Sequence, residues 1–208
     1  MTNFIYNHLL LPAADLAFHV AAPFNNKAQA AVEGRSGWEQ NLERQLNAAP
    51  SGQRMLLHAP SVGEFLQGRA VLDRILDHYP DQVAIVTHFS PSARKIVTGY
   101  KRAAAHSYLP LDTRRNVRRL LEIVDPSFIA FSRADVWPNL AEEISRRQIP
   151  AALIAGSLSE NSGVFSRAFL RFAGRRYQNL RFIGAISEED AERFKKLAKC
   201  KVVILEKE

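Results

Sequence analysis

The stretch MLLHAPSVGEF, residues 55–65, decides the fold. Its first five residues form an apolar run that is typical of a buried strand. The residues that follow, Ser61-Val62-Gly63-Glu64, have the composition of the opening turn of a helix. A buried strand that passes directly into a helix is the first half of a strand–helix–strand unit. The stretch therefore predicts an α/β protein.

The same pattern recurs along the chain. Six further apolar runs cover residues 83–87, 107–111, 128–131, 151–155, 182–186 and 202–205. The segments between them carry apolar residues at helical spacing, as at Val71 and Ile75 or at Val117, Leu120 and Leu121. This alternation predicts a parallel sheet that is covered on both faces. Right-handed crossovers make a doubly wound, Rossmann-like order the simplest topology.

Composition excludes several classes of protein. The 208 residues predict one large domain or a domain with an appendage, and 47% hydrophobic with 24% charged residues is ordinary for a globular chain. The single cysteine, Cys200, excludes an intramolecular disulfide and a cysteine-based zinc site, and favours a reducing compartment. Lys and Arg number 28 against 21 Asp and Glu, a net charge of +7. Nucleic-acid binding is not favoured, because acidic residues such as Glu142, Glu143 and Glu188 dilute the basic charge.

The N-terminal segment, residues 4–24, is apolar but interrupted. Polar residues and Pro12 break its run of Leu, Ala and Phe, so it fits neither a spanning helix nor a signal peptide. One interpretation is a helix whose apolar stripe packs on the domain. The other is a segment at a membrane interface, with Lys27 and Arg35 meeting lipid phosphates and with four aromatic residues entering the lipid: Phe4, Tyr6, Phe18 and Phe24. We divide the chain into a membrane-proximal helical segment, 1–46, and a Rossmann-like domain, 54–208.

Function is expected in the strand-to-helix turns, because ligands of such sheets bind beyond the carboxyl ends of the strands. The first turn has neither G-x-G-x-x-G nor a Walker lysine, which argues against dinucleotide and P-loop chemistry. Its Ser61 and Glu64 also fit a capping box, a purely structural role. In a second turn, Ser90 is the expected N-cap before Pro91, and Arg94 follows. Free amides and hydroxyls there could hold an anion.

Five ordered blocks carry a resemblance to a known family. They are His58-x-x-Ser61-Val62-Gly63-Glu64, Leu109-Pro110-Leu111-Asp112, Asp135-Val136-Trp137-Pro138-Asn139-Leu140, Leu158-Ser159-Glu160-x-Ser162 and Ser187-Glu188-Glu189-Asp190-Ala191-Glu192-Arg193-Phe194. In this order and spacing they resemble the N-terminal, acceptor-binding domain of 3-deoxy-D-manno-octulosonic acid (Kdo) transferases. The resemblance covers nearly the whole chain.

The resemblance implies a GT-B glycosyltransferase of two domains. The N-terminal half would bind a lipid A precursor and the C-terminal half CMP-Kdo, with inversion and without a metal or other cofactor, in lipopolysaccharide core biosynthesis at the cytoplasmic face of the inner membrane. Glu64 corresponds to the catalytic base. The expected substrate-binding residues are Ser61, Gly63, Ser90, Arg94, Arg133 and Asp135. The donor-binding domain is not expected within these residues, so the isolated chain is expected to be inactive.

One block departs from the family's pattern. Many relatives have Glu-x-Glu where this chain has Arg133-Ala134-Asp135. A positive charge there could bind an acceptor phosphate or lower the pKa of a neighbouring carboxylate. The alternative is a surface ion pair between Arg133 and Asp135, worth about 0 to 1 kcal/mol.

Other features leave two interpretations open. Arg167, Arg171 and Arg175 recur at helical spacing beside phenylalanines, which suits lipid phosphates, the donor domain or simply a solvated face. His58 and His88, near predicted strand ends, are too scattered for a metal set and are interpreted as core or loop residues. The rival function is a non-catalytic module that keeps the fold without the donor domain and binds anionic glycolipid or a protein partner.

Overall fold

A computed structural model describes residues 2–158 and 176–205. One parallel sheet forms its centre, with the strand order β3-β2-β1-β4-β5-β6-β7. The strands are β1 (Gln53–His58), β2 (Gln82–His88), β3 (Ala103–Tyr108), β4 (Phe128–Ser132), β5 (Ala151–Gly156), β6 (Phe182–Ala185) and β7 (Lys201–Ile204). Six of the seven predicted strands are confirmed at their places, and the third is shifted along the chain. The order reverses direction next to β1, so the turns after β1 and β4 meet at the switch point where such folds bind ligands.

The third strand differs from its prediction. It begins at Ala103 and ends at Tyr108, whereas the apolar run predicted residues 107–111. The backbone N–H of Leu109 still donates to the His88 carbonyl at 2.7 Å. Pro110 has no N–H to donate, so the strand ladder ends there.

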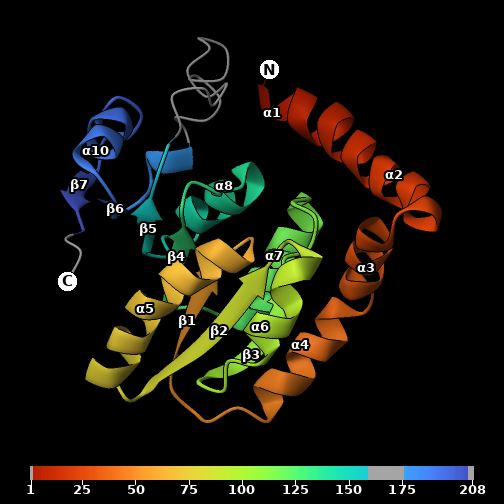
Figure 1. Cartoon of the computed structure of the whole chain (residues 1–208), viewed down its shortest axis with the longest axis horizontal. Helices are drawn as coiled ribbons and strands as arrows, with labels where there is room; N and C mark the ends of the chain where they lie inside the picture. Colours follow the sequence, from red (N-terminus) through yellow and green to blue (C-terminus); the bar gives the residue numbers. More distant parts are fainter. Residues whose placement is uncertain (1, 159–175, 206–208) are drawn as a thin grey trace.

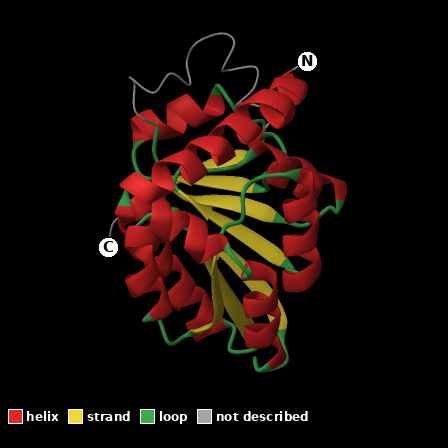
Figure 2. Ribbon diagram, turned by 90° about the vertical axis from the view of Figure 1, so that its right-hand side faces the viewer, coloured by secondary structure: helices red, strands yellow, loops and turns green. Residues whose placement is uncertain are grey.

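Helices cover both faces of the sheet, as Figure 2 shows. On one face lie α5 (Val62–His78), the 3₁₀ turn η3 (Pro91–Ala93) and α6 (Arg94–Thr98), whose apolar side chains share a core with Leu57. On the other lie α4 (Trp38–Asn47), α7 (Arg114–Val124), α8 (Pro138–Arg146) and α10 (Glu188–Lys195), which share a core with Leu56. Successive strand residues point to opposite faces. The doubly wound, Rossmann-like fold is therefore confirmed.

The N-terminal helices run along the β3 edge of the molecule, while β7 forms the opposite edge (Figure 1). They are α1 (Thr2–Ile5), the π-helical η1 (Tyr6–Leu10), α2 (Leu11–Ala21), the 3₁₀ turn η2 (Ala22–Phe24) and α3 (Asn26–Arg35), followed by α4. Asn25 caps α3 by accepting from the amides of Lys27 and Ala28. The domain division at residues 46 and 54 stays a prediction.

The apolar stripe of residues 4–24 does not pack on the domain. Of its large apolar residues, only Tyr6 and Leu11 are buried, and Phe18 is half-buried against Phe89. The others are exposed: Phe4, Ile5, Leu9, Leu10, Leu16, Val20 and Phe24. The packing interpretation is therefore wrong for most of the stripe. In the described part of the chain, none of the helices has both the length and the apolarity needed to cross a bilayer.

Two anchors fix these helices to the domain. The Tyr6 hydroxyl donates to Asp112 at 2.9 Å, and the amide side chain of Asn7 exchanges hydrogen bonds with that of Asn139. Farther along, Gly34 lies so close to the Tyr108 ring that a Cβ there would be 2.2 Å from it. The predicted arginine stripe at Arg167, Arg171 and Arg175 lies outside the described residues.

Candidate active site

Glu64 lies in the first turn of α5, directly after β1. Ser61 is the N-cap residue by backbone geometry, but its side chain makes no capping hydrogen bond. The Glu64 carboxylate instead accepts from Nη1 of Arg133, 2.9 Å from its Oε1. The other oxygen, Oε2, is buried and has no hydrogen-bond partner among the described residues. The capping-box interpretation is therefore wrong, and Glu64 has no structural task within its own helix.

Two features hold this turn in place. The Ser132 hydroxyl, at the end of β4, donates to the backbone carbonyl of Glu64 at 2.7 Å. Gly68, one turn later, lets α5 approach the sheet closely, since a Cβ there would lie 3.3 Å from Leu57 and 3.4 Å from Ser132. Gly63 is exposed, and a Cβ there would meet nothing within 4 Å. The turn that carries Glu64 is thus fixed, and the surface beside it at Gly63 is open.

Arg133 has the unusual backbone of this region. Its φ of +66° is left-handed, which is uncommon for a residue with a side chain. Its N–H donates to the Ile154 carbonyl at 2.9 Å, which holds that conformation. The guanidinium turns towards α5 and Glu64 rather than towards Asp135. The predicted surface pair between Arg133 and Asp135 is therefore wrong, because the left-handed residue directs the two side chains to different neighbours.

Asp135 contacts His58 and Trp137 instead. Its Oδ2 accepts from the Trp137 indole N–H at 3.2 Å and lies 3.5 Å from Nε2 of His58. His58 is fully buried, and its Nδ1 lies 3.1 Å from the Thr87 hydroxyl. Burial alone would raise the pKa of Asp135, but its contacts with His58 and Trp137 outweigh burial and lower that pKa. Asp135 is thus an ionised, partly exposed carboxylate with a fixed orientation.

His58 and Trp137 are functional candidates that residue-by-residue reasoning missed. His58 is a core residue, as predicted, but it also orients Asp135. The sequence did contain a signal for both residues, because both belong to the blocks that carry the family resemblance. Their contact with one acid depends on the adjacency of β1 and β4 in the sheet. Among the described residues, no group of three or more His, Cys, Asp or Glu side chains is placed to hold a metal ion.

Ser90 and Arg94 lie after β2, one strand farther along the sheet. Ser90 is the N-cap of the helical turn that Pro91 opens, as predicted, and its hydroxyl accepts from the Ser92 amide. The amide of Ser90 donates to the Pro60 carbonyl at 2.8 Å, so this turn is bonded to the first one. Arg94 begins α6 and is exposed. In the described structure, no hydrogen bond joins either residue to Glu64 or Asp135.

Aromatic rings continue the site towards the N-terminal helices. The rings of Phe89 and Trp137 are 5.1 Å apart, and Phe18 of α2 is 6.2 Å from Phe89. Arg35 stacks over Phe89 at 4.3 Å and donates to three backbone carbonyls. Burial lowers the pKa of Arg35 to about 10. Three of its five N–H donors are thus used inside the protein, and the contact of Arg35 with lipid phosphates stays a prediction.

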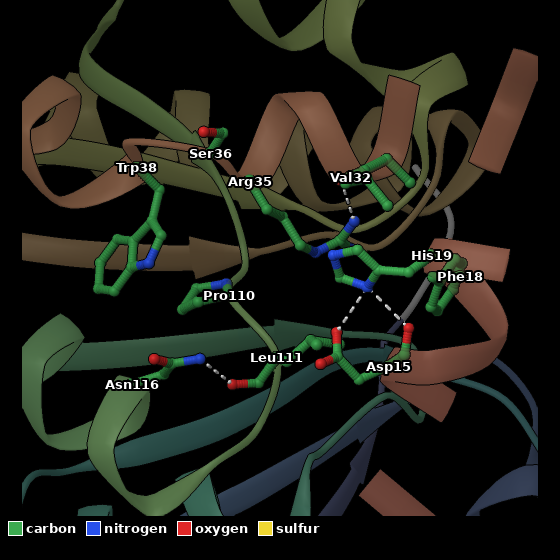
Figure 3. Close-up of a pocket in the computed structure, with 11 residues that line it drawn as sticks. Asp15, Phe18, His19, Val32, Arg35, Ser36, Trp38, Pro110, Leu111 and Asn116 are labelled. Atoms are coloured by element: carbon green, nitrogen blue, oxygen red, sulfur yellow. Dashed lines mark hydrogen bonds and ion pairs between the residues drawn. The ribbon is translucent and has the colours of Figure 1, made fainter. Parts of the chain in front are cut away.

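The rings of Phe18, Phe89 and Trp137 form what we call the aromatic seam. A pocket of about 310 Å³ lies beside it (Figure 3). It is bounded by α2, α3, the start of α4, the loop after β3 and α7. Its walls are mostly apolar, with Trp38 and Leu111 among them, and Asp15 pairs with His19 at 3.3 Å. The sequence did not predict this pocket, because residues 15–38 meet residues 110–116 only in the folded chain.

Blocks of the resemblance contact one another in pairs within the described residues, which include Leu158 of the fourth block. Asp112 accepts from the backbone amides of Asn139 at 2.8 Å and Leu140 at 2.9 Å, so the second block caps the helix of the third. Burial raises the pKa of Asp112 to about 7 against these hydrogen bonds. In the same way the amide of Leu158 donates to Asp190 at 2.7 Å, joining the fourth block to the fifth. These contacts join the second block to the third, and Leu158 of the fourth block to the fifth.

Comparisons with known proteins agree with the resemblance that these blocks carry. The family model of 3-deoxy-D-manno-octulosonic-acid transferases (kdotransferases) matches residues 32–206. The 3-deoxy-D-manno-octulosonic acid transferase of Haemophilus influenzae is 28% identical over 116 residues, 55% of this chain and 27% of that protein. The enzyme of the same name from Rickettsia felis is 29% identical over 156 residues, 73% of this chain and 33% of that protein.

Among solved structures, a UDP-GlcNAc 2-epimerase from Neisseria meningitidis superposes with a TM-score of 0.50 at 13% identity, over 73% of this chain and 46% of that one. That likeness concerns the fold alone. The chain spans about a third of the length of the curated transferases it matches. With the family model covering most of the sequence, the chain belongs to the family of 3-deoxy-D-manno-octulosonic acid transferases.

Proposed function

We propose that this chain is the acceptor-binding half of a Kdo transferase. The whole enzyme would transfer Kdo from CMP-Kdo to a lipid A precursor in lipopolysaccharide core biosynthesis, with inversion and without a metal or other cofactor. Glu64 is the general base. The observation that carries the proposal is the position of Glu64 in the turn after β1, next to the open surface at Gly63 and without a capping role in its helix.

The chemistry follows from one positioned carboxylate. Glu64 would take the proton of the acceptor hydroxyl as that oxygen forms its bond to the anomeric carbon of Kdo. The bond from that carbon to the phosphate of CMP breaks on the opposite face, and CMP leaves with the electron pair. Inversion needs a single displacement, so one base suffices on the acceptor side. The second carboxylate, Asp135, would hold another acceptor hydroxyl, and Ser61, Gly63, Ser90 and Arg94 would supply the remaining contacts with the acceptor.

Membrane attachment is the second part of the proposal. The exposed apolar side chains of residues 4–24 form a surface that water disfavours, and their helices are anchored to the domain through Tyr6 and Asn7. A helix of this kind lies in the bilayer interface without crossing it. We place the protein at the cytoplasmic face of the inner membrane, where its glycolipid acceptor would be presented to the aromatic seam.

The substitution Glu64→Gln in the whole transferase tests the base. The amide is isosteric, so kcat is expected to fall by about 10² to 10⁴ while the melting temperature stays nearly unchanged. Glu143→Gln is the matched control, since Glu143 is also held by arginines but lies in α8, away from the turn. Wild-type turnover by Glu64→Gln would exclude the base. Absence of turnover by the unchanged whole protein would favour the alternative function, a non-catalytic module that binds anionic glycolipid or a protein partner.

A further inference from the structure

The proposed base is covered in this structure. A general base needs an oxygen within hydrogen-bond reach of the hydroxyl that it deprotonates. The Oε1 atom of Glu64 is taken by Arg133 at 2.9 Å, and Oε2 is buried without a hydrogen-bond partner among the described residues. The carboxylate is only 12% exposed, whereas the Arg133 side chain above it is 54% exposed. Arg133 thus occupies the more accessible oxygen of Glu64 and limits the approach of an acceptor to it.

Arg133 is held weakly enough to move. The Arg133 side chain is exposed, so water solvates its guanidinium, and the long side chain loses entropy when it is held on Glu64. Glu64 is its one ion-pair partner in the described part of the chain. Arg35 shows the opposite case, with its donors fixed on three carbonyls and its guanidinium stacked on Phe89. Of these two arginines, Arg133 is the one that can exchange partners.

Arg133 would exchange Glu64 for another anion. A guanidinium presents a planar fork that matches phosphate oxygens and binds them with charge-assisted hydrogen bonds. The space beside Gly63 is open, and it lies at the N-terminus of α5, where uncapped amides add positive potential. A phosphate that enters there competes directly with Glu64 for Arg133.

We infer that Arg133 covers Glu64 in the free protein and is drawn away by a phosphate group of the glycolipid acceptor, so that binding of the acceptor uncovers the base. This inference rests on the proposed function. It gives Arg133 a positioning role, in which it exchanges one anion for another at little net cost. The site would also prefer a phosphorylated acceptor, because an acceptor without phosphate would leave Arg133 paired with Glu64.

Carboxylate labelling of the 208-residue chain tests this exchange without any transfer reaction. A carbodiimide and glycine ethyl ester modify accessible carboxylates, and peptide mass spectrometry gives the rate at Glu64. The arms are inorganic phosphate, glucose 1-phosphate and chloride at equal ionic strength. The variants are Arg133→Gln, which keeps a side chain on the left-handed backbone, and Arg94→Gln, which removes one exposed positive charge elsewhere. Glu143, also held by arginines, is the internal reference.

Both phosphates should raise the labelling of Glu64 in the unchanged chain about threefold to fivefold, the population change that an exposed ion pair supports. Arg133→Gln should label fast in every arm, whereas Arg94→Gln should respond like the unchanged chain. Slow labelling of Arg133→Gln would overturn the inference, and so would equal labelling in phosphate and chloride. If phosphate raised the labelling of Glu143 as much as that of Glu64, the effect would be general ionic screening. The inference would then be overturned as well.

A kinetic arm separates this inference from the proposed function. In the whole transferase, Arg133→Gln should lose the preference for a phosphorylated acceptor over its dephosphorylated form, chiefly through KM. If Glu64→Gln kept full turnover, Glu64 would be excluded as the base, but the labelling results would still support the exchange of partners by Arg133. If Glu64→Gln lost activity but phosphate did not change the labelling of Glu64, the role of Glu64 as the base would be supported. The proposed exchange of partners by Arg133 would be refuted.

Discussion

Membrane attachment through the N-terminal helices depends on side chains that face away from the domain. Leu9, Leu16 and Val20 are 61%, 65% and 61% exposed. Their replacement by serine removes apolar surface from the proposed interface and touches none of the hydrogen bonds that anchor the helices. Because these are exposed positions, we expect the stability of the fold to change little.

The size of the effect follows from the exposed area. Complete burial of a Leu or Val side chain contributes about 1.5 to 3 kcal/mol, so entry of the exposed three-fifths contributes about 1 kcal/mol or more per residue. The triple serine variant should therefore lose about 3 kcal/mol, which is more than a hundredfold in the partition constant. Lys27, exposed at the start of α3, adds about 1 kcal/mol on an anionic surface that salt removes.

Flotation with anionic liposomes measures this loss. The unchanged chain should float at low salt and somewhat less at high salt, and the triple variant should stay in the soluble fraction. Leu66→Ser is the matched control, because Leu66 is 48% exposed on α5, outside the N-terminal helices. Equal flotation of the triple variant and the unchanged chain would refute the reasoning, as would a loss of flotation by Leu66→Ser alone.

Three further predictions concern the anchors of the site. His58→Asn keeps an amide near Thr87 but cannot reach Asp135, so kcat/KM of the whole transferase should fall about fivefold, the cost of one hydrogen bond. His58→Gln should restore part of it, and equal losses accompanied by a lower melting temperature would mean a purely structural role. Gly34→Ala places a methyl group against the Tyr108 ring and should lower the free energy of unfolding by about 1 to 3 kcal/mol in urea titrations; an unchanged midpoint would contradict this packing. Asp112 binds its proton more tightly in the folded state, with a pKa of about 7 against 3.8. Its contribution to stability should therefore decline as pH rises from about 4 to 7. Asp112→Asn should remove that slope from thermal melts relative to the unchanged chain, and identical slopes would argue against it.

The strands and the first turn could be predicted because their signals are local. An apolar run such as residues 55–59 is followed at once by a helix start, and neighbouring residues suffice to read both. The end of β3 was misplaced because Leu109 and Leu111 are as apolar as the strand, while Pro110 stops its ladder. The capping box was wrong for a related reason, since Ser61 and Glu64 have the right spacing but Arg133 offers the carboxylate a charged partner.

The sequence by itself determined the alternation of strands and helices, the family and the turn that carries Glu64. Only the tertiary structure decided what each polar group contacts. The partner of Glu64 is 69 residues away in Arg133, and the anchor of Tyr6 is 106 residues away in Asp112. The exposed apolar face of the N-terminal helices was equally undecided, because the same residues could have packed inward. Periodicity reports which residues share a face, whereas the neighbour of that face depends on how distant segments meet.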